Sequence, residues 1–387
     1  ILKEQNFTAA EQAKIARLNE LRATFGNPGE PYAQVPSVSA PYSAGKLNDA
    51  FLQDGLNALN YIRAMAGLEA VTMSEEKNQN AQVGAMLLAI VFVPEFGVGQ
   101  GVWYSVFHSI SAFCNAGFDL MGVRAPYSSL VAYAGNPVVS LTIAGLIVVG
   151  GIGFLTWEDI RTNGLHLHAY RLQSKVILCV TFALIVLPAA YFYAFELSDA
   201  LPVGERVLSA LFQSITPRTA GFNTIDLTAL SEVGQMVLVM LMLIGGSPGS
   251  TAGGMKTTTL AVLLFSAAAV FSRREEPRCF GRRIEGDALR NAAAILLLYL
   301  SLFLLGGLAI SAMEDLPVVD CLFEAASAIG TVGLTLGITP GLGGPSRAIL
   351  IALMFFGRVG GLTLIFAALA GKRPCASKLP REKITVG

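Results

Sequence analysis

The sequence predicts an all-α, polytopic membrane protein with a small, helical, soluble segment at its N-terminus. Hydrophobic residues make up 53% of the 387 positions and charged residues only 14%, whereas about 25% of the residues of a typical globular domain are charged. Several apolar runs beyond residue 84 reach the roughly 20 residues that a helix needs to cross a bilayer. A short segment also recurs three times between these runs. These observations indicate a membrane protein built from repeats.

The charge and the cysteines exclude other classes of protein. Lys plus Arg and Asp plus Glu balance at 27 each, so no net field points to a nucleic-acid partner. The five cysteines lie far apart and lack the CxxC or Cys/His spacing of a zinc site or a disulfide framework. His108, His166 and His168 have no matched nucleophile or metal set, so we do not expect an enzyme.

Residues 1–84 form a polar segment unlike the rest of the chain. The segment begins at Ile1 without the pattern of a secretory signal peptide, and we expect that this is not a complete natural start. Residues 11–25 favour a short amphipathic helix, and residues 28–43 an extended linker. The apolar spacing over 52–62, and an N-cap at Ser74, predict two more helices, of which the second runs through Ala81. We therefore expect two domains, residues 1–84 and residues 85–387.

Long apolar segments define the predicted membrane domain. The clearest spans are residues 138–156, 176–195, 291–313 and 348–371, and residues 233–271 form one run that is broken in its middle. Residues 85–96 are too few to span and predict the outer half of a helix whose inner half is replaced; a short buried helix of a soluble domain is the alternative.

Basic residues gather in three segments of the membrane domain. These segments are residues 157–175, 272–290 and 372–387, whereas the loops between them hold little beyond Arg124, Arg206 and Arg347. The positive-inside rule therefore places the basic segments and the C-terminus in the cytoplasm.

The internal repeat is the most informative feature of the chain. The repeat reads FHSISAFCNAGFD at 107–119, FQSITPRTAGFN at 212–223 and FEAASAIGTVGLT at 323–335. In each copy a Phe opens a short amphipathic helix, and a hydroxyl residue and a glycine follow: Ser111 and Gly117, Thr216 and Gly221, Ser327 and Gly333. The predicted unit is a helix, a short re-entrant helix, a loop and a second helix.

A unit of this kind suits a cation. Non-helical backbone at membrane depth is tolerated only where it is buried in protein or lines a watery cavity. Glycine lets successive carbonyls turn toward one axis, and the preceding half-helix directs its negative end to the same place. A ring of such loops can replace the hydration shell of a potassium-sized ion; turns between packed helices are the alternative. The candidate filter residues are Asn115, Ala116, Gly117, Phe118, Thr219, Ala220, Gly221, Phe222, Thr331, Val332, Gly333 and Leu334.

The broken apolar run contains GGSPGSTAGGMKTTT at residues 245–259. So many glycines, with Pro248, cannot continue a helix without cost, so this backbone is expected to face a cavity or a pore and to serve as a gate. A small-residue helix-packing motif is one alternative. A degenerate phosphate loop is another, although it would need Gly in place of Met255 and a preceding strand. The candidate gating residues are Gly245, Gly246, Ser247, Gly249, Ser250, Thr251, Gly253 and Gly254.

Arg358 is the only charge inside the last apolar span. A charge in the membrane costs a few kcal/mol on insertion scales and normally faces the bundle interior. We expect Arg358 to repel or regulate a cation, or to hold the broken helix through its exposed carbonyls. Snorkelling is the alternative, but Arg358 lies over ten residues from either polar flank.

These motifs resemble the Trk/Ktr/HKT superfamily of potassium transporters, and most closely the bacterial Ktr-type membrane subunit, over residues 85–387. The resemblance implies four repeats that each supply one filter loop with a central glycine, a gating loop at 245–254 and an arginine beneath the filter at Arg358. It also implies transport of K⁺, possible coupling to Na⁺, no covalent cofactor, a homodimer in the bacterial plasma membrane and a cytoplasmic nucleotide-binding ring as regulator. One period before Gly117 the chain is polar, so the first repeat is missing and we expect no working conduction path from this chain alone.

Residues 40–88 resemble the first two helices of a bacterial CAP (SCP-like) extracellular domain, without its later strands or cavity histidines. The two resemblances meet at GAMLLA, which indicates a fusion. Potassium transport is therefore the first hypothesis. The alternative is a membrane-tethered CAP-like binding module without transport. The broken helices favour the first, since an anchor needs none.

Overall fold

The computed structural model describes residues 75–123, 128–198, 200–274 and 276–360, with two short strands and a few single residues before them. The chain divides into two units, Ile1–Gln79 and Asn80–Gly387. In the first unit β1 (Tyr32–Gln34) pairs antiparallel with β2 (Lys46–Leu47). The helices predicted at 11–25 and 52–62 fall mostly outside the described residues, as does the end of the span predicted at 348–371.

Helix α3 (Glu75–Phe96) runs through both the polar and the apolar pattern of its sequence. The predicted helix end near Ala81 is therefore wrong. Gly84, which lies in this region, does not end the helix, because its role is close packing: a Cβ there would lie 2.5 Å from the Ser109 Oγ of the next helix. The part Asn80–Phe96 counts among the shorter apolar helices, below the length of a span.

Two described helices are long and apolar enough to cross a membrane. The first, Leu172–Glu196, consists of α7 (Leu172–Tyr191) and the π-helical turn η4 (Phe192–Glu196). The second is α11 (Gly286–Glu314). Their outward-facing apolar side chains, such as Phe182 and Leu297, are exposed in the isolated chain and are suited to contact with lipid.

The segment predicted as a span at 138–156 is a bent helix pair. Helix α5 (Pro137–Gly151) and α6 (Phe154–Asn163) meet at an angle of 97°. The bend lies at Gly153, whose φ is 89° and where a Cβ would lie 2.6 Å from the carbonyl oxygen of Pro248. A contact with a distant segment therefore ends the helix earlier than its apolar pattern suggests.

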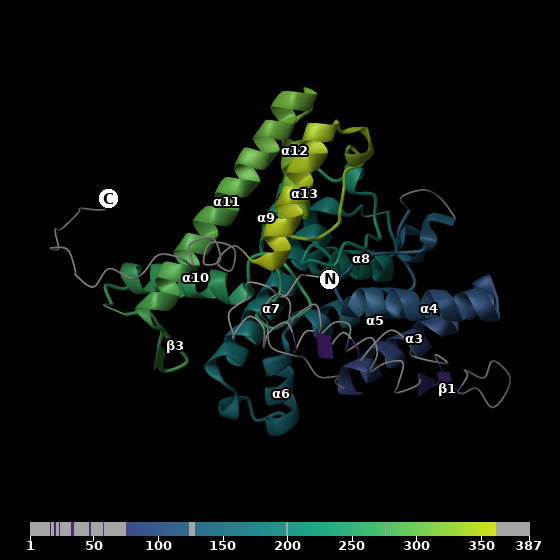
Figure 1. The fold of residues 1–387 in the computed structure, drawn as a ribbon, viewed down its shortest axis with the longest axis horizontal. Helices are drawn as coiled ribbons and strands as arrows, with labels where there is room; N and C mark the ends of the chain where they lie inside the picture. The colour runs from purple at the N-terminus through teal and green to yellow at the C-terminus, as the bar shows by residue number, and fades with distance from the viewer. Residues whose placement is uncertain are drawn as a thin grey trace. The chain divides into compact units, whose positions relative to one another are not determined.

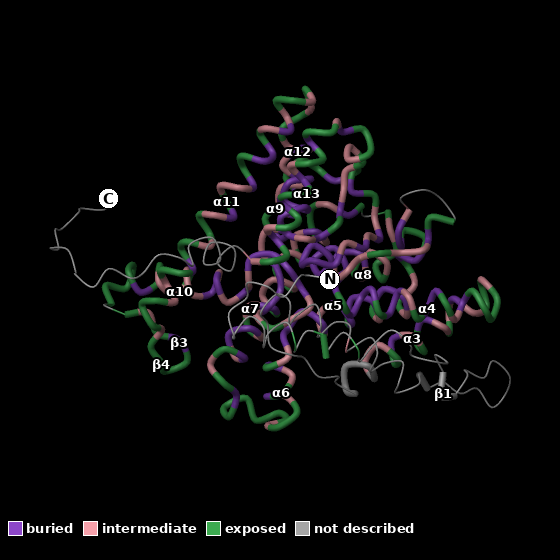
Figure 2. Tube along the Cα trace, in the orientation of Figure 1, coloured by how far each residue is buried: buried purple, intermediate pink, exposed green. Residues whose placement is uncertain are grey.

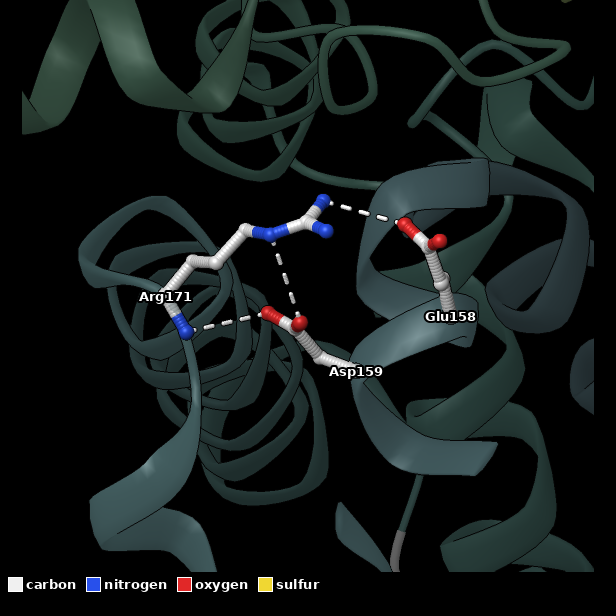
Figure 3. Close-up of polar contacts among 3 residues, drawn as sticks. All are labelled: Glu158, Asp159 and Arg171. Carbon is white, nitrogen blue, oxygen red and sulfur yellow. Dashed lines mark hydrogen bonds and ion pairs between the residues drawn. The ribbon is translucent and has the colours of Figure 1, made fainter. Parts of the chain in front are cut away.

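The turn from α6 into α7 is held by Arg171 (Figure 3). The backbone N–H of Arg171 donates to Asp159 Oδ2 over 3.0 Å, and its guanidinium lies 3.6 Å from Asp159 Oδ1 and 3.0 Å from Glu158 Oε2. Because Asp159 is buried, its contacts with Arg171 fix the turn between α6 and α7.

Three helices lead into the three loops of the repeat, as predicted: α4 (Val98–Phe113), α8 (Val203–Ile215) and α12 (Val318–Ile329). The prediction that a Phe opens each helix is wrong, because Phe107, Phe212 and Phe323 lie inside these helices rather than at their starts. Helix α4 packs on α5, α8 packs on α5 and α7, and α12 packs on α9, α11 and α13 (Gly344–Val359), the last group lying side by side in Figure 1.

The apolar run at 233–271 is broken in its middle, as predicted. Helix α9 (Glu232–Leu243) is separated from α10 (Thr257–Phe271) by non-helical backbone. A small hairpin, β3 (Arg278–Cys279) and β4 (Arg282–Arg283), follows α10. The remaining turns are 3₁₀: η1 (Met121–Val123), η2 (Val131–Tyr133), η3 (Leu167–Ala169), η5 (Leu227–Ala229) and η6 (Thr339–Gly341).

The core consists of two main apolar clusters. One joins side chains of α9, α11, α12 and α13, including Phe323 and Leu238; the other joins α3, α4, α5 and α8, including Phe92 and Phe212. Figure 2 shows buried residues gathered where α5, α8 and α9 approach one another, whereas much of α11 is exposed. The predicted all-α fold is confirmed.

Candidate ion path and gating loop

The three predicted filter loops have the same backbone conformation. In each, two residues with positive φ flank one without: Asn115 (50°) and Gly117 (71°), Thr219 (67°) and Gly221 (87°), Thr331 (53°) and Gly333 (94°). Positive φ is uncommon outside glycine, so a threefold recurrence at matched positions reflects a shared geometry. The flanked residues are Ala116, Ala220 and Val332.

The loops are in direct backbone contact. A Cβ on Gly117 would overlap the carbonyl oxygen of Ala220 and lie 3.0 Å from Gly221 Cα. A Cβ on Gly221 would overlap the carbonyl oxygen of Val332 and lie 3.5 Å from Gly333 Cα. Each of these glycines thus packs on the carbonyl that precedes the next glycine. The structure therefore brings three segments that are distant in sequence to one place.

Within the part of the chain that the structure describes, the arrangement of the three loops is open on one side. A Cβ on Gly333 would meet nothing within 4 Å among the described residues. The exposure of the residue that follows each glycine also differs between the loops. Phe222 is 0% and Leu334 3% exposed, whereas Phe118, in the first loop, is 70% exposed. Among the described residues, no further loop therefore lies between Gly333 and Phe118.

The hydroxyl residues of the repeat hold the loops in place. Ser111 Oγ donates to the carbonyl of Phe118 over 2.8 Å, and Thr216 Oγ1 donates to the carbonyl of Phe222. Ser327 Oγ instead accepts from the N–H of Gly333 over 3.1 Å. Each hydroxyl thus binds backbone at its own glycine or the next residue.

A second set of polar residues, which sequence reasoning missed, supports the exit of the first and the third loop. His108 Nε2 accepts from the N–H of Leu120 over 3.2 Å, and Glu324 Oε1 accepts from the N–H of Leu336 over 3.1 Å; both donors lie three residues after the loop glycine. Glu324 also accepts from Thr339 Oγ1 over 2.6 Å. The signal was the polar residue directly after the Phe of each repeat.

Gln213 is the member of this set that differs. It is fully buried, and neither polar atom of its amide has a hydrogen-bond partner among the described residues. The hydroxyl of Thr224, three residues after Gly221, is also buried and has no hydrogen-bond partner among the described residues. The middle loop thus lacks the support that His108 and Glu324 give the other two.

The predicted gating loop folds against the filter loops. Thr251 Oγ1 lies 2.7 Å from Asn115 Oδ1, 3.1 Å from the carbonyl oxygen of Phe113 and 3.1 Å from that of Gly150. On the other side, a Cβ on Gly253 would overlap the Thr331 hydroxyl. The loop therefore touches the start of two filter loops.

Further hydrogen bonds fix the loop to helix ends. Ser247 N–H donates to the carbonyl of Gly151 over 2.9 Å, and Gly249 accepts from Phe154 N–H over 2.9 Å. Ser250 Oγ donates to the carbonyl of Ser247 over 2.6 Å. Three further backbone hydrogen bonds involve glycines of the loop: Gly245 N–H donates to the Met255 carbonyl, Thr257 N–H to the Gly246 carbonyl, and Gly254 N–H to the Gly357 carbonyl.

Both alternatives for this segment are wrong. Helix α9, not a strand, precedes it, so the segment lacks the strand of a phosphate loop. The segment between Leu243 and Thr257 is also not helical, which rules out a helix-packing motif there.

Two cationic side chains bind the carbonyls of the loop. Arg358, in the last turn of α13, donates from Nη1 to the carbonyl of Thr251 over 2.9 Å. This contact is the one expected if Arg358 holds the broken helix through its carbonyls. Lys256, which sequence reasoning did not single out, donates from Nζ to the carbonyl of Ala252 over 2.7 Å.

The comparison with known proteins agrees with this architecture. Residues 82–372 match the TrkH model of cation transport proteins. The chain belongs to the Trk/Ktr family. Solved structures include a similar one, the potassium transporter TrkH from Vibrio parahaemolyticus, with a TM-score of 0.60 and 19% identity over 82% of this chain and 69% of that one, which shows the shared fold.

Curated relatives extend the comparison. The potassium/sodium uptake protein NtpJ of Enterococcus hirae is 40% identical over 79% of this chain and 68% of its own length. The Ktr system potassium uptake protein B is 36% identical in Bacillus subtilis, over 74% of this chain and 64% of the relative, and 33% identical in Vibrio alginolyticus, over 79% and 67%. The chain thus spans about two thirds of the length of these relatives.

The resemblance of residues 40–88 to a CAP domain finds no support. The family match begins at residue 82, inside the region assigned to that resemblance, and α3 continues through it without interruption. Residues 82–88 therefore belong to the transporter match. The remainder of that region lies mostly outside the described residues.

Proposed function

We propose that this chain is the larger part of a potassium uptake subunit of the plasma membrane, in which backbone carbonyls replace the hydration shell of K⁺. One observation carries the proposal: the three loops repeat one positive-φ backbone, and two of their glycines, Gly117 and Gly221, pack on the carbonyl of the next loop. Rings of carbonyl oxygens select potassium in filters of this kind. The names of the similar proteins, which specify potassium and in one case also sodium, support this choice of ion.

The proposed filter consists of residues 115–118, 219–222 and 331–334. Helices α4, α8 and α12 end directly before these loops, so the negative ends of three half-helices favour a cation there. Because the loops leave the side between Gly333 and Phe118 open, an ion would stay partly hydrated on that side. Transport therefore requires a fourth loop in this gap.

The proposed gate is the loop of residues 245–254, which blocks the path beneath the filter while Arg358 binds the Thr251 carbonyl. Thr251 also contacts Asn115, so a movement of the gating loop changes a contact of the first filter loop. Opening requires that the loop leave both contacts.

Charge and family support the remaining assignments. The basic segments at 157–175, 272–290 and 372–387 favour a cytoplasmic position for these segments and for the C-terminus. Two relatives are named as proteins of a Ktr system, which supports an assembled transporter. We assign a homodimer with a cytoplasmic nucleotide-binding ring subunit as the assembly, and residues 85–387 as its transport domain.

Growth of a potassium-uptake-deficient bacterial strain at low K⁺ tests this function. The 387 residues alone are expected not to restore growth. A chimera that carries the N-terminal quarter of Enterococcus hirae NtpJ joined before residue 82 is expected to restore growth and the uptake of ⁸⁶Rb⁺. Rescue by the 387 residues alone would contradict the need for a fourth loop. Failure of a membrane-inserted chimera would contradict the transport function.

A further inference from the structure

Lys256 occupies an unusual position at the start of α10. It is the N-cap residue of that helix, where the positive end of the helix dipole disfavours a cation. No ion pair between Lys256 and a carboxylate is present among the described residues. The local environment therefore repels the ammonium group, and another contact must compensate.

The compensating contact is with the gating loop. Lys256 Nζ lies 2.7 Å from the carbonyl oxygen of Ala252 and 3.5 Å from that of Gly253. The preceding carbonyl, that of Thr251, is bound by Arg358. Three successive carbonyls of the loop are thus directed at cationic groups that come from two different helices.

These carbonyls lie next to the proposed filter. Thr251 contacts Asn115 of the first loop, and Gly253 packs on Thr331 of the third. An ion that leaves the filter on this side therefore meets the carbonyls of residues 251–253 next. Carbonyl oxygens that hold an ammonium group also suit K⁺, because both are compact monovalent cations that bind oxygen.

We propose that the carbonyls of Thr251, Ala252 and Gly253 form a second monovalent-cation site on the ion path, and that the Lys256 ammonium occupies it as a tethered substitute for the transported ion. This inference rests on the proposed transport function. The site conducts when the flexible lysine stem withdraws, and it is closed when the ammonium is bound. Arg358 and Asn115 hold the loop in its closed position, and the Lys256 ammonium fills the cation site within it, so opening requires both that the loop leave Arg358 and Asn115 and that the lysine withdraw.

Restoring a charge at position 256 by chemistry tests the proposal in the chimera with the NtpJ quarter. Lys256→Cys removes the ammonium, and ⁸⁶Rb⁺ uptake per membrane-inserted copy is expected to rise roughly 10- to 150-fold, the range that corresponds to one hydrogen bond with a charged group. Treatment with 2-aminoethyl methanethiosulfonate attaches a new ammonium group and is expected to return uptake to the starting value. Ethyl methanethiosulfonate attaches a neutral group of similar size and is expected to leave uptake high.

Two controls separate a plug from a structural role. Lys175→Cys is the matched variant, since Lys175 also donates to a backbone carbonyl, that of His168 over 2.9 Å, but in an exposed turn; its uptake is expected to stay constant under both reagents. The unsubstituted chimera, treated in the same way, reports on the native cysteines. If the cysteine variant does not accumulate, Lys256→Met, which removes the charge, is compared with Lys256→Arg, which keeps it. Uptake is expected to rise in Lys256→Met only.

The outcomes distinguish the two proposals. Equal effects of the charged and the neutral reagent on Lys256→Cys, or unchanged uptake in that variant, would overturn the plug while leaving transport intact. Absence of uptake in the chimera and in every variant would overturn transport itself, and the plug with it.

Discussion

Gly221 allows the sharpest test of the contact between neighbouring loops. In Gly221→Ala the new methyl group would overlap the carbonyl oxygen of Val332 and lie 3.2 Å from its carbon. The residue also keeps a φ of 87°, which side chains rarely adopt. The substitution therefore strains both the backbone and the packing.

The size of the effect follows from these two terms. A left-handed conformation costs an L-residue roughly 1–2 kcal/mol. Forcing a methyl group into a packed site costs about 1–3 kcal/mol more. Gly337→Ala is the matched control, because Gly337 has a φ of 92° but nothing within 4 Å of its Cβ position among the described residues. Gly337→Ala therefore carries the cost of the left-handed backbone but not the cost of packing a methyl group.

Thermal unfolding in detergent and ⁸⁶Rb⁺ uptake measure the difference. We expect Gly221→Ala to lower the unfolding midpoint more than Gly337→Ala and to abolish uptake in the chimera. Gly333→Ala should behave like Gly337→Ala in the 387 residues alone, and like Gly221→Ala once a fourth loop fills the gap. Equal destabilisation by Gly221→Ala and Gly337→Ala would refute the loop-to-loop contact, and an unchanged Gly333→Ala in the chimera would refute the position of the gap.

Three further substitutions test the polar contacts around the loops. Glu324→Ala should lower the free energy of unfolding by about 1–3 kcal/mol or more, because it removes the acceptor of the Leu336 N–H. Glu324→Gln keeps an acceptor and should lower the free energy of unfolding less. Similar unfolding midpoints of the two variants would contradict this role of Glu324. Gln213→Met should leave the midpoint unchanged or raise it, since the amide has no partner among the described residues, and a marked fall would reveal a partner such as a bound water. Thr251→Val should raise ⁸⁶Rb⁺ uptake in the chimera, because it frees the gating loop from Asn115. Thr251→Ser keeps the hydroxyl and should leave uptake unchanged. Identical uptake in the two variants would count against the contact between Thr251 and Asn115 as a brake on opening.

The sequence was sufficient for those features that are local and repeated. The order of a Phe, a hydroxyl residue and a glycine predicted three re-entrant units, because each unit depends on residues within a dozen positions. The break near Gly245 was predictable for the same reason, since glycine and proline act on their own backbone. The family resemblance then supplied the expectation of four loops.

Features that depend on distant contacts were not predictable. Helix α5 ends at Gly151 because Gly153 packs on Pro248, about a hundred residues later, and no apolar pattern encodes that contact. The support from Glu324 and the contact of Lys256 with the loop also become visible only once the backbone partner is placed. The resemblance to a CAP domain, which was drawn from two short helices, found no support, because short amphipathic helix patterns are common to many folds.

The positive φ values of Asn115, Thr219 and Thr331 have a consequence for how variants of this filter would evolve. Glycine would relieve roughly 1–2 kcal/mol at Thr219 and at Thr331, so mutation to glycine is thermodynamically downhill there for the folded loop, whereas at Asn115 it would also remove the contact with Thr251. The same change would multiply the conformations open to the loop before it folds and loosen its shape afterwards. Retaining a side chain at these positions exchanges some stability for a narrow distribution of carbonyl positions, and discrimination between ions of nearly equal radius depends on that distribution.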